Sequence, residues 1–414
     1  MALNKENDME NERCVWLETV INKQLNDKSI ARVIGIDEKQ AVPEGNNYTS
    51  IITRAKLHAI LRNGEKSKIN VIIKNEHVDE KKIQVLEVIP TFKTEIMAYS
   101  NILHKCELLM NEYDDQNEKL WCQLIGYRPN NLIVFEDLKV KNYVLTDRSK
   151  MLDLNHSSLV LHNLGRLHGL CFVLIKKGLL SKSDTPPFYA ETDFQVIKNF
   201  YEGSMKQLGL TIEKYWPSEW KEIGKRIYKQ HEVVSGKIKK LVTTPPDDCF
   251  ITLCHGDVWC TNMLFKYCPY DSSYPISHKF LDFQTIHINS SVFDVMHFIS
   301  SSVQPDVRRR HFDKLLNIYV NSLKSTLAIY GMEDCSPTID QINKELERIE
   351  YYGLVITLIM LPIVVAEGTD AFNMEELNID GDPLEAFNPQ NYKNERYKSA
   401  VQPELKAWFK KGLF

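Results

Sequence analysis

The pattern of apolar and polar positions changes character along the 414-residue chain. Apolar residues at helical spacing, such as Trp16 and Ile21, predict a first amphipathic helix. Residues 30–73 then alternate between apolar and polar in three runs, which predicts three antiparallel strands joined by two turns. The runs 121–127 and 131–135 predict two further strands. The first third of the chain is therefore expected to form a small antiparallel sheet.

Helical spacing dominates from about residue 156 onward. Residues 158–177 form a strongly amphipathic pattern, and residues 193–240 predict two more helices. Further helices are expected over 306–330, 339–367 and 396–411. The apolar run 353–366 contains Pro362 and is too short to span a bilayer, so it predicts a buried helix. A chain of 414 residues is too long for one simple core, and two lobes are expected.

The stretch 249–284 interrupts the helices with three short apolar runs that predict strand, tight loop, strand, hairpin and strand. Asp257, Asn262 and Asp282 lie at the ends of these runs. A carboxylate and an amide on one loop, facing a second carboxylate across a hairpin, are what phosphoryl transfer needs. Asp257 would accept the proton of a hydroxyl, while Asn262 and Asp282 would hold the magnesium that neutralises the phosphates of ATP.

Residues upstream of this stretch supply candidates for the ATP side. Lys74 ends the third strand in a Val-Ile-Ile-Lys sequence similar to the Val-Ala-Ile-Lys of protein kinases, and Glu95 on the following helix could pair with it. The turn at 43–50 can point backbone N–H groups and hydroxyls at phosphate oxygens, although it has neither GxGxxG nor a P-loop. The residues of that turn with candidate roles are Asn46, Asn47, Tyr48, Thr49 and Ser50.

The segment Phe135-Glu136-Asp137-Leu138 lies where a two-lobed kinase has its hinge. Adenine is expected to bind the carbonyl of Glu136 and the N–H of Leu138. Beyond Asp282, Asp294 lies near the start of a helix, where it either caps that helix or braces the catalytic loop through hydrogen bonds.

Composition excludes several classes of partner. A net charge of −4 gives no reason to expect nucleic acid or an anionic membrane surface, and no protein partner is implied. The N-terminus lacks an apolar signal core, and none of the nine cysteines forms a CxxC pair, which predicts reduced thiols in a cytoplasmic protein. His156, His162 and His168 recur every six residues and do not share a helical face, so packed or surface histidines are expected rather than metal ligands.

The sequence HGDVWCTNMLF followed by LDFQ resembles the choline-kinase and aminoglycoside-phosphotransferase side of the protein kinase-like fold. More narrowly, it resembles the ecdysteroid kinase-like family of insects and other invertebrates. The resemblance implies an α+β, two-lobed fold with a small antiparallel-sheet N-lobe (1–138) that binds ATP. The mostly helical C-lobe (139–414) would carry the catalytic loop, the metal site and the acceptor pocket.

The resemblance also assigns roles. Asp257 becomes the catalytic base, and Asn262 and Asp282 become ligands of Mg²⁺. Lys74 and Glu95 become the pair that grips the ATP phosphates, and Asn46 to Ser50 become the phosphate loop. The acceptor it implies is an ecdysteroid or a similar hydroxylated lipid or xenobiotic alcohol.

Two departures from protein kinases favour a small-molecule kinase. Gly256 stands where the His-Arg-Asp motif has its arginine, so the usual partner of an activation-loop phosphate is missing. Gln284 stands where Asp-Phe-Gly has its glycine, which argues against inactivation by a flip of the phenylalanine.

The acceptor stays open at this level. The helix 353–366, with Tyr351 and Tyr352 before it, could line an apolar acceptor pocket, although a core helix is the simpler interpretation. A choline-, ethanolamine- or aminoglycoside-type acceptor would instead need carboxylates. The candidates are Glu345, Glu347, Glu350, Glu367 and Asp370. A second hypothesis is a catalytically silent kinase-like protein that binds a small molecule, but such a protein has no need for the whole set of chemical residues.

Overall fold

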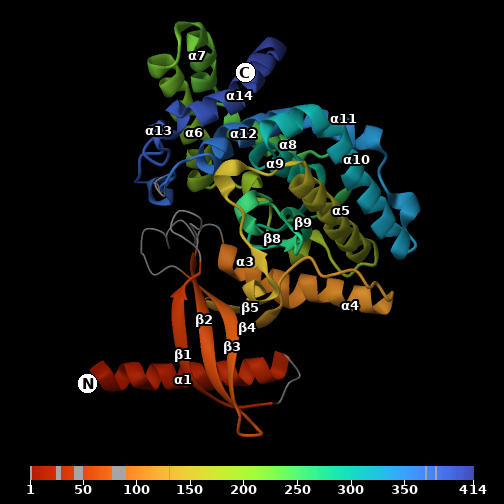
Figure 1. The fold of residues 1–414 in the computed structure, drawn as a ribbon. Coiled ribbons are helices and arrows are strands. Elements are labelled where there is room, and N and C mark those ends of the chain that lie inside the picture. Colours follow the sequence, from red (N-terminus) through yellow and green to blue (C-terminus); the bar gives the residue numbers. More distant parts are fainter. Residues whose placement is uncertain are drawn as a thin grey trace. The chain divides into compact units, whose positions relative to one another are not determined.

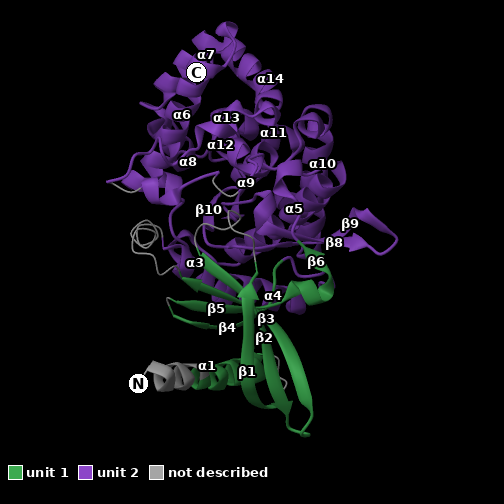
Figure 2. Cartoon of the chain, turned by 60° about the vertical axis from the view of Figure 1, so that its left-hand side comes forward, with its two compact units in different colours: residues 1–78, 121–144 green, residues 79–120, 145–414 purple. Residues whose placement is uncertain are grey.

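The computed structural model describes residues 2–24, 29–41, 50–76, 90–129, 131–368, 371–377 and 380–414 (Figure 1). The chain separates into two compact units (Figure 2). The first comprises Met1–Val78 and Trp121–Val144, and the second comprises Asp79–Leu120 and Leu145–Phe414. The boundary predicted after residue 138 differs from this division, because the segment Asp79–Leu120 clusters with the second unit.

Within its described residues, the first unit contains a five-stranded antiparallel sheet with strand order β1-β2-β3-β5-β4. The predicted helix and strands of this region are confirmed. The elements are α1 (Ala2–Gln24), β1 (Ile30–Gln40), β2 (Ser50–Leu61), β3 (Lys66–Glu76), β4 (Leu124–Arg128), β5 (Leu132–Glu136), the 3₁₀-helix η2 (Leu138–Lys141) and β6 (Tyr143–Val144).

Helix α1 packs on one face of this sheet. Leu17 and Ile21 are fully buried in a cluster with the inward-facing strand residue Leu57. The absence of a side chain at Gly126 on β4 permits the approach, because a Cβ there would lie 2.8 Å from the Cβ of Val20. The alternating pattern of the strands thus buries their apolar side against the amphipathic helix.

The described part of the second unit is mostly helical and also contains the strands β7 to β10 (Figure 1). Its helices are α3 (Thr91–Met97), the π-helix η1 (Ala98–Leu103), α4 (His104–Glu112), α5 (Leu154–Lys176), α6 (Gln195–Tyr215), α7 (Lys221–Gln230), α8 (Val234–Thr243), the 3₁₀-helix η7 (Cys260–Asn262), α9 (Val292–Ser301), α10 (Pro305–Ile329), α11 (Ile339–Arg348), α12 (Glu350–Val364), α13 (Pro389–Lys393) and α14 (Glu395–Lys411), besides further short 3₁₀ turns. Its strands are β7 (Ile251–Cys254), β8 (Met263–Cys268), β9 (Asp271–Phe280) and β10 (His287–Ser290).

Two helix boundaries differ from the sequence-based prediction. Residues 193–243, all of them described, hold three α-helices rather than two, because Pro217 follows the end of α6 and a turn over 231–233 separates α7 from α8. The predicted helix 339–367 is divided at Ile349 into α11 and α12. Periodicity alone did not locate these short interruptions.

Two apolar helices form the interior of the second unit. Among the described residues, α5 is the helix long and apolar enough to cross a membrane by length and composition, but 78% of its apolar window is buried inside the structure. Such burial is typical of a core helix. Helix α12 is buried along almost its whole length, which confirms the buried helix predicted from the run 353–366. The sheet and the many helices make a mixed α and β protein that is consistent with a kinase-like fold, whereas the two-lobed arrangement stays a prediction.

Candidate active site

The stretch 249–284 folds in the predicted order of strand, loop, strand, hairpin and strand. Strand β7 pairs antiparallel with β10, and β8 pairs antiparallel with β9. The predicted chemical residues follow the strand ends: Asp257 comes three residues after β7, Asn262 directly precedes β8, and Asp282 comes two residues after β9. Each strand end therefore delivers one polar side chain to the same region.

Asp257 and Asn262 are in direct contact. The Nδ2 of Asn262 donates to the backbone oxygen of Asp257 at 3.0 Å and to its Oδ2 at 2.8 Å. Because the amide nitrogen is used in this way, the Oδ1 of Asn262 is its atom suited to bind a cation. The backbone oxygen of Asn262 accepts from the N–H of Leu281 at 2.9 Å, which ties the residue before Asp282 to this loop.

The backbone at Asp282 is in the left-handed region, with φ of +65°. This conformation is uncommon outside glycine and requires support from its surroundings. The support comes from the next residue, Phe283, whose buried ring lies edge-on to Tyr99 with centroids 5.5 Å apart and 4.6 Å from the ring of His255. Packing of the phenylalanine thus fixes the direction of the aspartate.

The negative charges of Asp257 and Asp282 favour a bound cation at this site. Burial and the negative charge of Asp282 raise the pKa of Asp257 to about 7, against the lowering effect of the hydrogen bond from Asn262. Among the described residues, no group of three or more His, Cys, Asp or Glu side chains could hold a metal. Two mutually repelling carboxylates and an amide oxygen instead suit Mg²⁺, which keeps several waters and uses one or two protein carboxylates together with phosphate oxygens.

Asp294 braces the candidate catalytic loop and is not the N-cap residue of its helix, which decides between the two predicted roles. The N-cap residue of α9 is Ser291, and Asp294 lies in the first turn of the helix. Its Oδ2 accepts from the backbone N–H of His255 at 2.6 Å, and its Oδ1 accepts from the N–H of Gly256 at 2.9 Å. The carboxylate thus holds the two residues that precede Asp257.

Two further buried groups complete this brace. His168 on α5 donates from Nε2 to the Oδ2 of Asp294 at 3.1 Å, and the Tyr319 hydroxyl lies 2.9 Å from its Nδ1. Burial alone would raise the pKa of Asp294, but the hydrogen bond from His168 and the attraction of nearby histidines lower it to about 2. The prediction that His168 is a packed histidine is confirmed.

A steric constraint requires glycine at the second position of the His-Gly-Asp motif. Gly256 has φ of +82°, and a Cβ at this position would lie 2.3 Å from the backbone oxygen of Thr285. An arginine, as found in protein kinases, cannot occupy this backbone. The preceding His255 donates from Nε2 to the Leu281 oxygen at 2.9 Å, and its Nδ1 accepts from the N–H of Asp257 at 3.3 Å.

Sequence-based reasoning missed His297, which lies on α9 one turn after Asp294. Its Nε2 is 3.6 Å from the Oδ1 of Asp257, and its Nδ1 is 3.2 Å from the hydroxyl of Tyr352 on α12. The signal available in the sequence was its spacing, because a residue three positions after Asp294 lies near the same helical face.

Comparison with known proteins agrees with this geometry. The profile of the ecdysteroid kinase-like family matches residues 44–332 of the 414-residue chain. The chain belongs to the ecdysteroid kinase-like family. The family suggested by the sequence motifs is therefore confirmed, and with it a place among kinase-like phosphotransferases of small molecules. No curated protein matches the chain.

The ATP-side residues expected for an ecdysteroid kinase-like protein are only partly described. Lys74 on β3 of the first unit and Glu95 on α3 of the second unit are both buried, and their pairing stays a prediction. Ser50, the first residue of β2, is buried as well. The other expected phosphate-loop residues, Asn46, Asn47, Tyr48 and Thr49, lie outside the described residues.

The expected hinge segment is held by several hydrogen bonds within the first unit. Asp137 accepts from the Nε of Arg54 at 2.7 Å and from the N–H of Lys139 at 3.1 Å. The side chain of Glu136 accepts from the N–H of Gln123 at 2.9 Å. Leu138 is the first residue of η2, so its N–H has no partner within that helix. These contacts fix the backbone on which the predicted adenine contacts depend.

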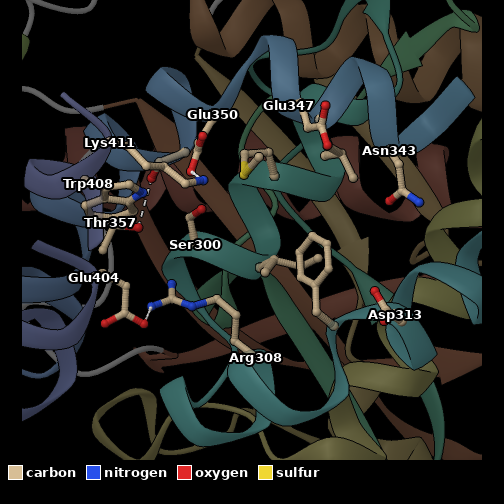
Figure 3. Close-up of a pocket in the computed structure, with 15 residues that line it drawn as sticks. Ser300, Arg308, Asp313, Asn343, Glu347, Glu350, Thr357, Glu404, Trp408 and Lys411 are labelled. Atoms are coloured by element: carbon tan, nitrogen blue, oxygen red, sulfur yellow. Dashed lines mark hydrogen bonds and ion pairs between the residues drawn. The ribbon is translucent and has the colours of Figure 1, made fainter. Parts of the chain in front are cut away.

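A cavity of about 530 Å³ lies elsewhere in the second unit (Figure 3). Met296, Ile299 and Ser300 line it from a face of α9 other than the one that carries Asp294 and His297. Glu347 and Glu350, two of the carboxylates considered for a cationic acceptor, also line this cavity. They therefore do not mark the surroundings of Asp257.

Two of the five carboxylates considered for a cationic acceptor pair with cations elsewhere. Glu350 pairs with Lys411 at 2.7 Å, and the buried Glu345 pairs with Arg348 at 2.8 Å. Asp370 lies outside the described residues.

Proposed function

We propose that this ecdysteroid kinase-like protein transfers the γ-phosphoryl group of ATP to a hydroxyl group of a small molecule. One observation carries the proposal. Asp257 is held by two hydrogen bonds from Asn262, and its pKa is raised to about 7 by burial and by the charge of Asp282. Two carboxylates and an amide in this relation are the groups that phosphoryl transfer uses.

Asp257 would act as the base. Its carboxylate accepts the hydroxyl proton of the acceptor while the oxygen attacks the γ-phosphorus, and ADP leaves. A pKa near 7 suits a group that must be ionised before the reaction and take a proton during it. Asn262 fixes one carboxylate oxygen, and Asp294 fixes the backbone of the two preceding residues. Such positioning supplies much of the catalysis in this type of reaction.

The residues for a metal ion are Asn262 and Asp282. Bound there, Mg²⁺ would neutralise negative charge on the ATP phosphates. In the first unit, Lys74, supported by Glu95, would bind the phosphates together with the segment Asn46 to Ser50. The backbone of Glu136 and Leu138 would bind adenine. These assignments rest on the family motifs and on the hydrogen bonds that hold the hinge segment.

We further propose an ecdysteroid or a similar hydroxylated lipid or xenobiotic as the acceptor, modified in the cytoplasm. One contact beside Asp257 supports an acceptor with a hydroxyl group: the Nε2 of His297, a neutral imidazole, lies 3.6 Å from the Oδ1 of Asp257. Glu345 and Glu350, which a choline- or aminoglycoside-type acceptor could have used, already pair with cations. All nine cysteines are free thiols, which suits a reducing compartment.

The test is Mg²⁺-dependent phosphorylation of ecdysone, choline and an aminoglycoside, with the product identified by mass spectrometry. We expect a phosphorylated ecdysone from the wild type and a loss of at least a hundredfold in Asp257→Ala. If only choline or the aminoglycoside is phosphorylated, the proposed ecdysteroid acceptor is wrong. Equal signals from both proteins, or binding of ecdysone without turnover of any acceptor, would instead favour the silent binding protein.

A further inference from the structure

His297 presents an unused hydrogen-bonding atom to the candidate site. Its side chain is 4% exposed, and its Nε2 has no hydrogen-bond partner among the described residues. A buried polar atom without a partner is costly and calls for a ligand or a role. The Nε2 lies 3.6 Å from the Oδ1 of Asp257, the carboxylate oxygen that Asn262 does not hold.

This distance is informative. At 3.6 Å the two atoms are too far apart for a direct hydrogen bond. They are close enough for a single hydroxyl oxygen to lie within hydrogen-bond distance of both. The acceptor hydroxyl that donates its proton to Asp257 is a group of this size and chemistry.

The tautomer of His297 is assigned from its other contact. Burial lowers the pKa of His297 to about 4, so the ring is neutral at physiological pH. Burial also raises the pKa of Tyr352 far above its usual value, which keeps its hydroxyl protonated and able to donate. We assign this hydroxyl, 3.2 Å from Nδ1, as the donor to Nδ1, which leaves the proton of the neutral ring on Nε2.

We propose that His297 binds the acceptor hydroxyl, donating from Nε2 to its oxygen while that hydroxyl donates to the Oδ1 of Asp257. The inference rests on the proposed phosphoryl transfer and adds a catalytic residue to it. The proton of the hydroxyl passes to Asp257 as the O–P bond forms, and the imidazole remains neutral throughout. His297 thereby selects the orientation in which a lone pair of the oxygen faces the phosphorus.

Two conservative variants separate this role from a structural one. Glutamine places its amide nitrogen near the position of the histidine Nε2, whereas asparagine places its polar atoms near Nδ1 and can keep only the contact with Tyr352. We expect His297→Asn to lower kcat/KM for ecdysone by about 10- to 100-fold with an unchanged KM for ATP. His297→Gln should recover most of that loss. The reverse order, with Asn active and Gln impaired, would show a structural role and overturn the inference.

A matched control is His278→Asn. His278 is also buried, and its Nε2 also lacks a hydrogen-bond partner among the described residues, but its Nδ1 lies 3.2 Å from the Nδ2 of Asn163 on α5. The variant His278→Asn should lower the melting temperature without changing the KM for ecdysone. If the wild type phosphorylates ecdysone, Asp257→Ala does not, and both His297 variants match the wild type, only the inference fails. If the wild type phosphorylates no acceptor, the proposed function fails and the inference with it.

Discussion

The replacement Asp294→Asn tests the brace behind the catalytic loop. The carboxylate of Asp294 accepts from the backbone N–H groups of His255 and Gly256 and from the Nε2 of His168. Asparagine has the same shape but one acceptor oxygen, so its amide NH₂ would face a donor. The change therefore removes one backbone hydrogen bond and the negative charge together.

The magnitude follows from the pKa. A value of about 2 against the ordinary 3.8 means that the fold favours the ionised form by about 2.5 kcal/mol, at 1.36 kcal/mol per pKa unit. A backbone N–H left buried without a partner adds about 1–3 kcal/mol. We expect Asp294→Asn to lower the free energy of unfolding by about 3.5–5.5 kcal/mol, the sum of the two contributions. At about 2 cal/mol/K per residue, a chain of 414 residues has an unfolding entropy of about 0.9 kcal/mol/K, so the melting temperature should fall by on the order of 5 °C.

The assay pairs thermal unfolding with acceptor phosphorylation, and Asp306→Asn is the control. Asp306 is also an acidic residue in the first turn of a helix, α10, but its side chain is 70% exposed and pairs with Arg309. It should shift the melting temperature by no more than about 2 °C. Asp294→Asn should also lower kcat at least tenfold, because Asp257 follows the two braced residues. Equal shifts in the two variants would mean that Asp294 acts only through the helix terminus, and the brace would be refuted.

Two other predictions address the loop and the buried histidines. Gly256→Ala should destabilise the protein much more than Gly178→Ala and should abolish phosphorylation. Both glycines have positive φ, but of the two only Gly256 has a backbone oxygen 2.3 Å from the position of a Cβ. Similar melting temperatures for the two variants would contradict this. Burial lowers the pKa of His278 to about 3 and those of His287 and His297 to about 4, below the 6.5 of an unfolded chain. Their contribution to stability is therefore complete above pH 6.5 and falls as the pH drops toward 4, by about 1.4 kcal/mol per histidine at pH 5.5. The denaturant midpoint should decrease from pH 7.5 to 5.5 and decrease less in His278→Gln, and an unchanged midpoint would contradict the burial of neutral rings.

Local periodicity was sufficient for the sheet and the hairpins. On β2, Ala55, Leu57 and Ala59 alternate with more exposed residues and are all buried, as a two-residue period requires. The predicted positions of Asp257, Asn262 and Asp282 at strand ends are observed because turns between short strands were visible as polar segments. Their assigned roles in catalysis and metal binding stay predictions.

Local sequence patterns could not predict the long-range contacts that position the loop before Asp257. Asp294 contacts residues 38 and 39 positions earlier in the chain, and its third donor, His168, is 126 positions earlier. Nothing in the local sequence states which buried donor meets which acceptor across such separations. Gly256 illustrates the same limit: the motif showed a missing arginine, whereas the cause is the position of the Thr285 backbone oxygen.

The two faces of α9 explain why the carboxylates in the sequence could not identify the acceptor. Asp294 and His297 contact the catalytic loop, while Met296, Ile299 and Ser300 line the separate cavity together with Glu347 and Glu350. A count of acidic residues in this part of the sequence therefore mixes two environments. At Asp257 itself, the Nε2 of His297 lies 3.6 Å from the Oδ1 and belongs to a neutral imidazole, which can bind a hydroxyl group. If the proposed transfer is correct, acceptor choice should respond to changes at His297 and Tyr352 and not to changes at Glu347.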